Sequence, residues 1–195
     1  HLEIIEAADV LAGGRQQVAL FPEFEGEVLQ IDRHIDAFIQ QLKERIPDRR
    51  VVVLGSGDPL FHGIGTTLLA HFDKSLLRFH PNVSSVAAAF AAIKESWHDA
   101  EIISLHNPKL PPFSFARLAR ISKAVFLTRP SADPVYIARQ LVNHHLCQFT
   151  LCVLEHLGVP EKETISWFNH PAEILSRSFS HPNVVVLLKQ EKASS

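Results

Sequence analysis

Val51-Val52-Val53-Leu54-Gly55-Ser56-Gly57-Asp58-Pro59-Leu60-Phe61-His62-Gly63-Ile64-Gly65-Thr66-Thr67 is the stretch of this sequence that decides the fold. Its first four residues are apolar and three of them are β-branched, which predicts a buried strand. Gly55 and Gly57 permit positive φ and let a ligand approach the backbone closely, and Pro59 prevents the strand from continuing. Beyond Gly65 the apolar residues have helical spacing. A strand, a glycine turn and a helix in this order predict an open α/β sheet with a ligand at the turn.

The residues of this turn exclude two common phosphate-binding motifs. No Gly-Lys-Ser/Thr follows, as a phosphate-binding loop requires, and the glycines do not open the helix directly, as the dinucleotide fingerprint requires. Asp58 lies inside the turn, where its carboxylate would repel a phosphate and suit a hydroxyl or cationic group. The alternative is that the turn is only a tight connection without a ligand.

Composition restricts the class of protein. The chain has 195 residues, 46% hydrophobic and 21% charged, which predicts a globular protein of one large or two small domains. The net charge of −2 and the lack of a basic stripe argue against nucleic acid as the main partner. No apolar run reaches the ~20 residues that cross a bilayer, so we expect a cytoplasmic protein without a membrane segment. Cys147 and Cys152 could form a disulfide, but reduced thiols are typical of that compartment.

Strand and helix patterns alternate along the chain, which predicts an α/β fold. A proline-rich break at 106–112 predicts the domain boundary, with one α/β domain at 1–108 and a second at 109–195. The predicted strands are 10–12, 51–54, 76–79, 100–105, 124–127, 148–154, 164–168 and 184–188. The predicted helices are 2–8, 35–46, one after Gly65, 84–94, 115–121, 134–145 and 171–179.

The turn at 55–65, Gly-Ser-Gly-Asp-Pro-Leu-Phe-His-Gly-Ile-Gly, resembles the Gly-Asp-Pro segment of the tetrapyrrole methylases. Three further segments at 8–15, 81–91 and 97–106 resemble that family in the same order along the chain. They read Ala-Asp-Val-Leu-Ala-Gly-Gly-Arg, then Pro-Asn-Val-Ser-Ser with its helix, then Trp-His-Asp-Ala followed by Ser-Leu-His. Together they are similar to the branch that methylates C5 of a precorrin in cobalamin synthesis.

The resemblance implies two α/β domains with S-adenosylmethionine bound in a cleft between them. It also implies a strand and a glycine-rich turn ahead of residue 1, so we expect that residue 1 is not the biological start. Asp58 is then a cofactor-binding or turn-fixing group rather than a base. The implied cofactor-binding residues are Gly57, Asp58, Leu60, Ile64, Ser84, Ser85 and Thr128.

The substrate of such an enzyme is a polycarboxylate ring, a precorrin or cobalt-precorrin. His106, at the end of a predicted strand, is the candidate for substrate contact or proton handling, the alternative being a bond within its own loop. Arg15 could bind a substrate carboxylate or could be a solvated surface arginine. Lys109 and Arg129 are further candidates of the same kind. Ser84 or Ser85 could also cap the helix that follows, which is compatible with binding a ligand.

Other functions fit the residues less well. The 12 histidines show no metal-ligand spacing, so we predict no metal site. Ser56 lacks the Gly-x-Ser-x-Gly context of a hydrolase nucleophile. Asn82 replaces a glycine that is usual in the family, which keeps open a non-catalytic, ligand- or partner-binding relative. Methylation at another ring position is the nearest enzymatic alternative. The resemblance implies a homodimer, and a separate protein for C15 methylation and decarboxylation.

Overall fold

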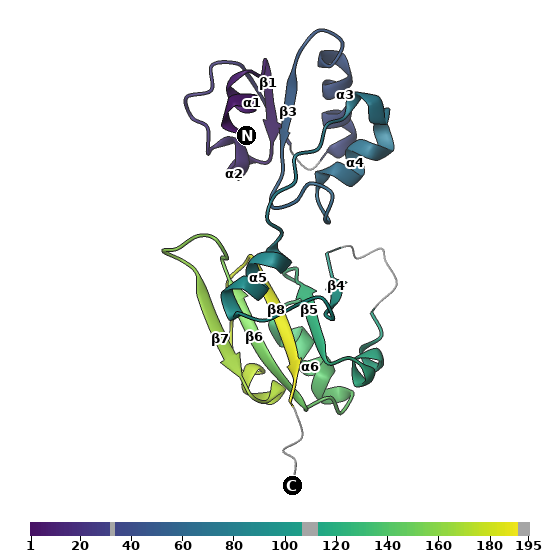
Figure 1. The fold of residues 1–195 in the computed structure, drawn as a ribbon, viewed down its shortest axis with the longest axis vertical. Helices are drawn as coiled ribbons and strands as arrows, with labels where there is room; N and C mark the ends of the chain where they lie inside the picture. The colour runs from purple at the N-terminus through teal and green to yellow at the C-terminus, as the bar shows by residue number, and fades with distance from the viewer. Residues whose placement is uncertain (32–33, 107–112, 191–195) are drawn as a thin grey trace. The chain divides into compact units, whose positions relative to one another are not determined.

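The computed structural model describes residues 1–31, 34–106 and 113–190 (Figure 1). The chain forms two compact units, residues 1–84 (unit 1) and residues 85–195 (unit 2). Each unit contains its own sheet and its own hydrophobic core, so each is described separately.

Unit 1 is built on a parallel three-stranded sheet in the order β2-β1-β3, whose strands are Glu27–Gln30, Val10–Gly13 and Val51–Leu54. Val10 of β1 lies opposite both Glu27 and Val51, so the three strands run in register from their first residues. The 11-residue helix α3 (Ile35–Arg45) covers the sheet with an apolar face. The other helices of unit 1 are α1 (Leu2–Glu6), α2 (Arg15–Val18), α4 (Ile64–His71) and the 3-10 helix η1 (Lys74–Leu76).

The strand predicted at 76–79 does not form, and that prediction is wrong. Leu76 ends η1, and residues 77–84 belong to no helix or strand. Leu77 packs against the core of unit 1, so its apolar character is used for packing. A strand also needs a hydrogen-bonded neighbour, and none of the described strands of unit 1 pairs with this segment.

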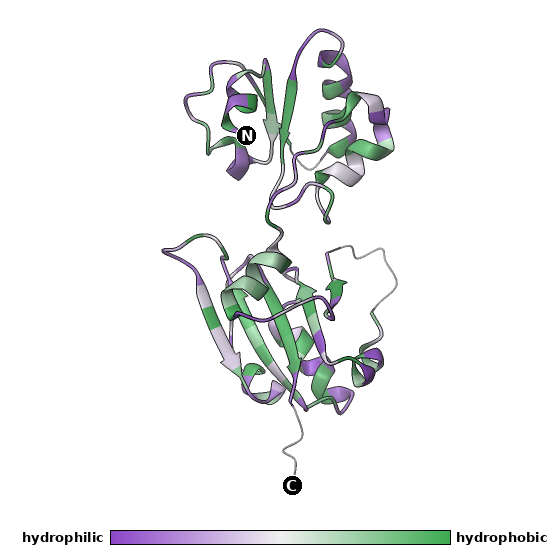
Figure 2. Cartoon of the chain, in the orientation of Figure 1, coloured by the Kyte–Doolittle hydropathy of each residue, from purple (hydrophilic) through white to green (hydrophobic). Residues whose placement is uncertain are grey.

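Unit 2 is built on a five-stranded sheet in the order β4-β5-β8-β6-β7. The strands are Glu101–Ser104, Lys123–Leu127, Asn183–Lys189, Phe149–Glu155 and Thr164–Phe168, in that order. Only the β4–β5 pair is parallel among the described strands of this sheet. The three central strands are the most apolar part of the unit, as Figure 2 shows, and most of their residues are fully buried.

Helices pack on this sheet to complete the core of unit 2. Helix α6 (Pro134–Asn143) and the 3-10 helices η2 (Phe115–Arg120) and η3 (Pro171–Ile174) share one core with Phe126 and Leu187. Helix α5 (Ser85–Ile93) packs on β8 and buries Val86, Ala89 and Phe90. Longer helices were predicted at 115–121 and 171–179, where the chain forms the shorter 3-10 turns instead.

The division between the units comes earlier in the chain than the predicted boundary at 108/109. Strand β4 pairs with β5 from Glu101 to Ser104, which places it in unit 2 together with α5. Residues 107–112 of the proline-rich break, with Lys109, lie outside the described residues. The pairing of β4 with a later strand outweighs the local break signal because a ladder is a long-range interaction.

Within the described ranges, no helix is long and apolar enough to span a membrane.

Candidate functional site

The glycine turn of unit 1 follows the carboxyl end of β3, as predicted. Strands β1 and β3 are parallel with Gly13 opposite Leu54, so the segments after both strands lie at one edge of the sheet. The side-chain amide Nε2 of Gln17, in α2, donates to Ser56 Oγ at 2.9 Å and ties the two segments together. Arg15 begins α2 and is exposed, so the structure brings it to the edge where the turn lies.

Gly57 has φ of +62°, which confirms the need for a glycine at this point of the turn. A Cβ placed there would lie 3.5 Å from the carbonyl oxygen of Val83 and 3.7 Å from Cα of Ser84. The turn therefore lies against the Val83–Ser84 segment. Two predicted residues far apart in sequence, Gly57 and Ser84, are thus neighbours within unit 1.

Asp58 holds the turn in shape. Its Oδ1 accepts a hydrogen bond from the backbone N–H of Leu60 at 2.8 Å, and its backbone carbonyl accepts from Phe61 at 3.2 Å. This is the Asx-turn geometry by which an aspartate fixes its own loop. One carboxylate oxygen is committed to the turn, which agrees with the turn-fixing role considered for Asp58. The side chain of Leu60 is half-exposed beside it.

The start of α4 packs tightly onto the turn. The N–H of Gly65 donates to the carbonyl oxygen of Pro59 at 2.9 Å. A Cβ on Gly65 would lie only 2.5 Å from that oxygen, so the approach requires a glycine. Ile64, the first residue of α4, lies against Gly55, where a Cβ would be 3.5 Å from its Cγ2 atom. Ile64 therefore packs beside the turn.

His106 and Thr128 of unit 2 also follow the carboxyl ends of neighbouring parallel strands. Strands β4 and β5 pair with Ser104 opposite Leu127, and the N–H of Leu105 donates to the carbonyl of Leu127 at 2.9 Å. The hydrogen bonding thus extends one residue past β4, to the last residue of β5. His106 is exposed at this edge, and its backbone N–H lies 3.4 Å from Ser104 Oγ.

The hydroxyl of Thr128 is buried and already has partners. It lies 2.7 Å from the carbonyl oxygen of Asn183 and 2.6 Å from Asn183 Oδ1, and the side chain is 4% exposed. The amide of Asn183 donates in turn to the carbonyl of Ser180 at 2.7 Å. Sequence reasoning missed Asn183, because no local pattern connects two residues 55 positions apart.

Ser84 and Ser85 lie on the two sides of the division between the units. Ser84 is the last residue of unit 1, and Ser85 is the first residue of α5. Ser84 therefore occupies the position just before the helix, as the capping interpretation requires. Ser85 is exposed at the first turn of α5, where backbone N–H groups have no partner within the helix.

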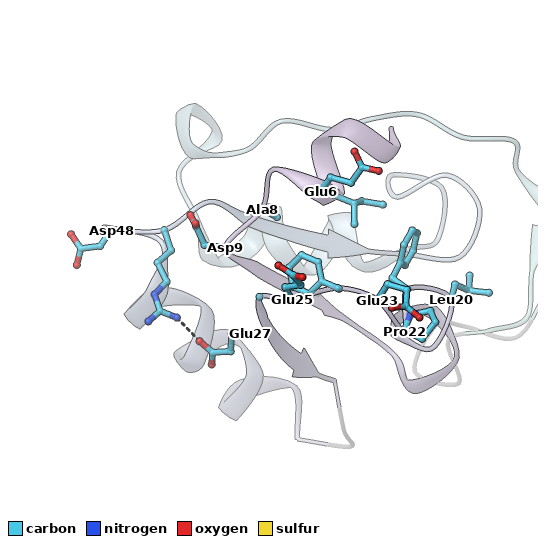
Figure 3. A pocket seen from close by; sticks show the side chains of 14 residues that line it. Glu6, Ala8, Asp9, Leu20, Pro22, Glu23, Glu25, Glu27 and Asp48 are labelled. Atoms are coloured by element: carbon cyan, nitrogen blue, oxygen red, sulfur yellow. Dashed lines mark hydrogen bonds and ion pairs between the residues drawn. The ribbon is translucent and has the colours of Figure 1, made fainter.

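A hollow of about 1000 Å³ lies at the other edge of the unit 1 sheet (Figure 3). Its lining residues include Asp9 before β1, Arg49 before β3 and Glu27, the first residue of β2. None of the predicted site residues lines it. Its acidic members are Glu6, Asp9, Glu23, Glu25, Glu27 and Asp48.

Glu27 is the best-connected acid of this hollow. Arg45 and Arg49 both bond its carboxylate, Arg49 from Nη1 at 2.5 Å. Its hydrogen bond with Arg45, followed by the charges of both arginines, holds the pKa of Glu27 below its usual value, although partial burial opposes the shift. Glu27 is thus held by neighbouring arginines and serves the structure. Among the described residues, no group of three or more His, Cys, Asp or Glu could hold a metal ion.

Comparison with known proteins identifies the family. The family model described as Tetrapyrrole (Corrin/Porphyrin) Methylases matches residues 1–168 of this chain. The chain belongs to this family. The cobalt-precorrin-7 C(5)-methyltransferase of Salmonella typhimurium is 36% identical to this chain over 186 residues. That match covers 95% of this chain and 89% of the relative.

A longer relative and a solved structure are also similar to this chain. The precorrin-6Y C(5,15)-methyltransferase [decarboxylating] of Mycobacterium tuberculosis is 32% identical over 157 residues, which is 80% of this chain but 39% of that protein. The crystal structure of uroporphyrin-III C-methyltransferase from Thermus thermophilus, complexed with S-adenosylhomocysteine, matches with a TM-score of 0.72 at 19% identity. It covers 95% of this chain and 87% of that one, and at this identity it supports the tetrapyrrole methylase fold alone.

Proposed function

We propose that this tetrapyrrole methylase transfers the methyl group of S-adenosylmethionine to C5 of a precorrin or cobalt-precorrin in cobalamin synthesis. The observation that carries the proposal is the 36% identity to a cobalt-precorrin-7 C(5)-methyltransferase over nearly the full length of both chains. The geometry supports it, because the family's Gly-Asp-Pro turn keeps its glycine at positive φ and its aspartate in the turn.

The residues of the turn fit the cofactor chemically. S-Adenosylmethionine carries an ammonium, a sulfonium and ribose hydroxyls, which suit the carboxylate of Asp58 better than a phosphate would. Gly57 has no side chain to keep a ligand from its backbone. We assign cofactor binding to Gly57, Asp58, Leu60, Ile64 and Ser84 of unit 1 and to Ser85 and Thr128 of unit 2. Because the Thr128 hydroxyl is bonded to Asn183, its contribution is through the backbone.

The chemistry asks little of the protein beyond positioning. When bound, S-adenosylmethionine supplies a methyl group already activated by the positive sulfur. The protein must hold the substrate carbon in line with that methyl and exclude water, which can lower a barrier by roughly 7–11 kcal/mol. We assign Arg15 to a substrate carboxylate and His106 to substrate contact or proton handling at the strand ends where they lie.

The assembly and location of the enzyme are also proposals. We infer a homodimeric, cytoplasmic protein that works with a separate C15-methylating decarboxylase. The relative that suggests this second activity is the precorrin-6Y C(5,15)-methyltransferase [decarboxylating], whose name gives methylation at both positions and decarboxylation. Sedimentation of the natural full-length protein tests the dimer.

The first experiment combines cofactor binding with product analysis. Calorimetric titration with S-adenosylhomocysteine is run on the wild-type protein and on Asp58→Asn, which keeps an acceptor for the Leu60 N–H but removes the charge. Asp73→Asn is the matched control, because Asp73 Oδ1 makes the same bond to the Ser75 N–H at 2.8 Å in another loop. We expect micromolar binding that only Asp58→Asn weakens. Binding that both variants retain unchanged would contradict the role of Asp58.

The reaction itself is tested with isotope-labelled S-adenosylmethionine and both substrates, metal-free and cobalt-containing. Nuclear magnetic resonance of the product locates the labelled carbon. A label at C5 with no loss of carbon dioxide is the expected result. A label at another ring carbon would reassign the position, and binding of S-adenosylhomocysteine without turnover on either substrate would leave a non-catalytic relative.

A further inference from the structure

Arg129 is held in a fixed place at the carboxyl end of β5. Its backbone N–H donates to the carbonyl of Ala132 at 3.3 Å, and the Ala132 N–H donates back to the Arg129 carbonyl at 2.9 Å. These two bonds close a four-residue turn directly after Thr128. The backbone of Arg129 is therefore held at the end of the strand.

The guanidinium of Arg129 contains a buried donor without a partner. Its Nε atom is inaccessible to solvent and has no hydrogen bond to any described residue. Nor does the guanidinium form an ion pair within the described ranges. The nearest acid in sequence, Asp133, is engaged elsewhere, since its Oδ1 caps α6 by accepting from the Tyr136 N–H at 2.8 Å. A buried charged donor of this kind is costly unless something bonds it, so it calls for an explanation.

The surroundings of Arg129 are those of a ligand site. Strands β4 and β5 are parallel and pair Ser104 with Leu127, so His106 and Arg129 each lie two residues beyond these paired residues, at the same edge of the sheet. The loops after two parallel strands are where α/β sheets bind ligands. At this edge the Thr128 hydroxyl is committed to Asn183, whereas the Arg129 Nε–H is still unsatisfied.

We propose that Arg129 binds a carboxylate of the bound ligand through Nε–H and an adjacent Nη–H. Arginine presents these two donors side by side at the spacing of the two carboxylate oxygens. The inference rests on the proposed function, which supplies two carboxylates: that of the methionine part of the cofactor and those on the rim of the tetrapyrrole. The chemistry at Arg129 is the same for both, and the experiment separates them.

The variants distinguish a role of Arg129 in stability from a role in ligand binding. Arg129→Met keeps an unbranched apolar stem of similar shape, and Arg129→Lys keeps the charge but loses the paired donors. The control is Arg120→Gln, an exposed arginine just before the other end of β5. Because the Nε–H has no partner in the protein, we expect neither Arg129 variant to lower the urea midpoint of the ligand-free protein below that of the control.

Three probes then locate the carboxylate. S-Adenosylhomocysteine carries the amino-acid carboxylate, 5′-methylthioadenosine lacks it, and uroporphyrin is a stable polycarboxylate tetrapyrrole that needs no turnover. If Arg129 holds the cofactor, Arg129→Met weakens S-adenosylhomocysteine about tenfold and leaves methylthioadenosine unchanged. If it holds the ring, Arg129→Met weakens uroporphyrin and raises KM for the precorrin about tenfold with little change in kcat.

The outcomes separate this inference from the proposed function. If Arg129→Met binds all three probes with the affinity of the wild type, the role of Arg129 is overturned. A lower urea midpoint of both Arg129 variants without ligand would overturn it as well. A wild-type protein that binds uroporphyrin through Arg129 but methylates no precorrin would uphold the inference while the proposed function fails.

Discussion

Replacement of Gly57 by alanine tests the glycine turn, because the structure separates the backbone effect from any clash. At φ of +62° an alanine is in the left-handed region, which costs about 1–2 kcal/mol for a residue with a Cβ. The new Cβ would lie 3.5 Å from Val83 O, an ordinary contact that adds no further penalty. We therefore expect the free energy of unfolding to fall by about 1–2 kcal/mol and no more.

Gly158→Ala is the matched control for this change. Gly158 has φ of +82°, and a Cβ there would meet no atom within 4 Å. The backbone penalty is therefore the same, while the position lies in the turn between β6 and β7 of unit 2. Urea denaturation should show similar losses for the two variants.

Ligand binding should distinguish the two variants. The methyl group of Gly57→Ala lies between the turn and the Val83–Ser84 segment, so we expect S-adenosylhomocysteine to bind about tenfold more weakly, which is about 1.4 kcal/mol. Gly158→Ala should bind like the wild type in the same calorimetric titration. Equal affinity of both variants would refute the assignment of the turn to the cofactor. A loss of stability at Gly57 well beyond that at Gly158 would refute the geometry.

Three other predictions follow from individual contacts. Thr128→Val should lower the free energy of unfolding by about 1–3 kcal/mol, since it leaves the buried amide oxygen of Asn183 without its donor; urea denaturation measures this. The bond from Arg45 lowers the pKa of Glu27, so the stability that this carboxylate adds is present above its unfolded pKa and is lost as the pH falls through the lower folded pKa. The urea midpoints of wild type and Glu27→Gln should therefore differ at pH 7 and converge in acid, and a difference that persists in acid would refute the pairing. Burial raises the pKa of the Cys152 thiol to about 12, so a thiol reagent at neutral pH should label it only after unfolding.

Local sequence signals predict the strands well where a run is apolar and rich in β-branched residues. The predicted burial of residues 51–54 is wrong, because all four residues of β3 are only partly buried. The runs that form β3, β5, β6 and β8 are continuous and apolar, and each lies within a residue or two of its predicted bounds. The strand predicted at 76–79 does not form: its residues, Leu-Leu-Arg-Phe, include no β-branched one, and none of the described strands of unit 1 pairs with them. Strand β2 and the short helix α2 were missed because neither has a strong apolar period.

Some features of the candidate site follow from a short stretch of sequence, whereas others depend on contacts between distant residues. The conformation of Gly57 and the Asx turn of Asp58 are local, so a motif of a few residues predicts them. The link between Thr128 and Asn183 depends on the pairing of β5 with β8, and the burial of the Arg129 Nε atom is likewise a property of the folded chain. No spacing along the chain encodes either one, so only the folded structure reveals them.

Parallel pairing explains why the candidate residues gather at all. In an antiparallel pair, the segments that follow the two strands leave from opposite ends, whereas in a parallel pair they leave from the same end. Unit 1 is parallel throughout, which brings Arg15 and the Gly57 turn together. The described sheet of unit 2 has a single parallel pair, β4–β5, and this pair alone brings His106 and Arg129 to one edge. The antiparallel strands of unit 2 then serve to bury β5 and fix its carboxyl end, through the bond between Thr128 and the first residue of β8.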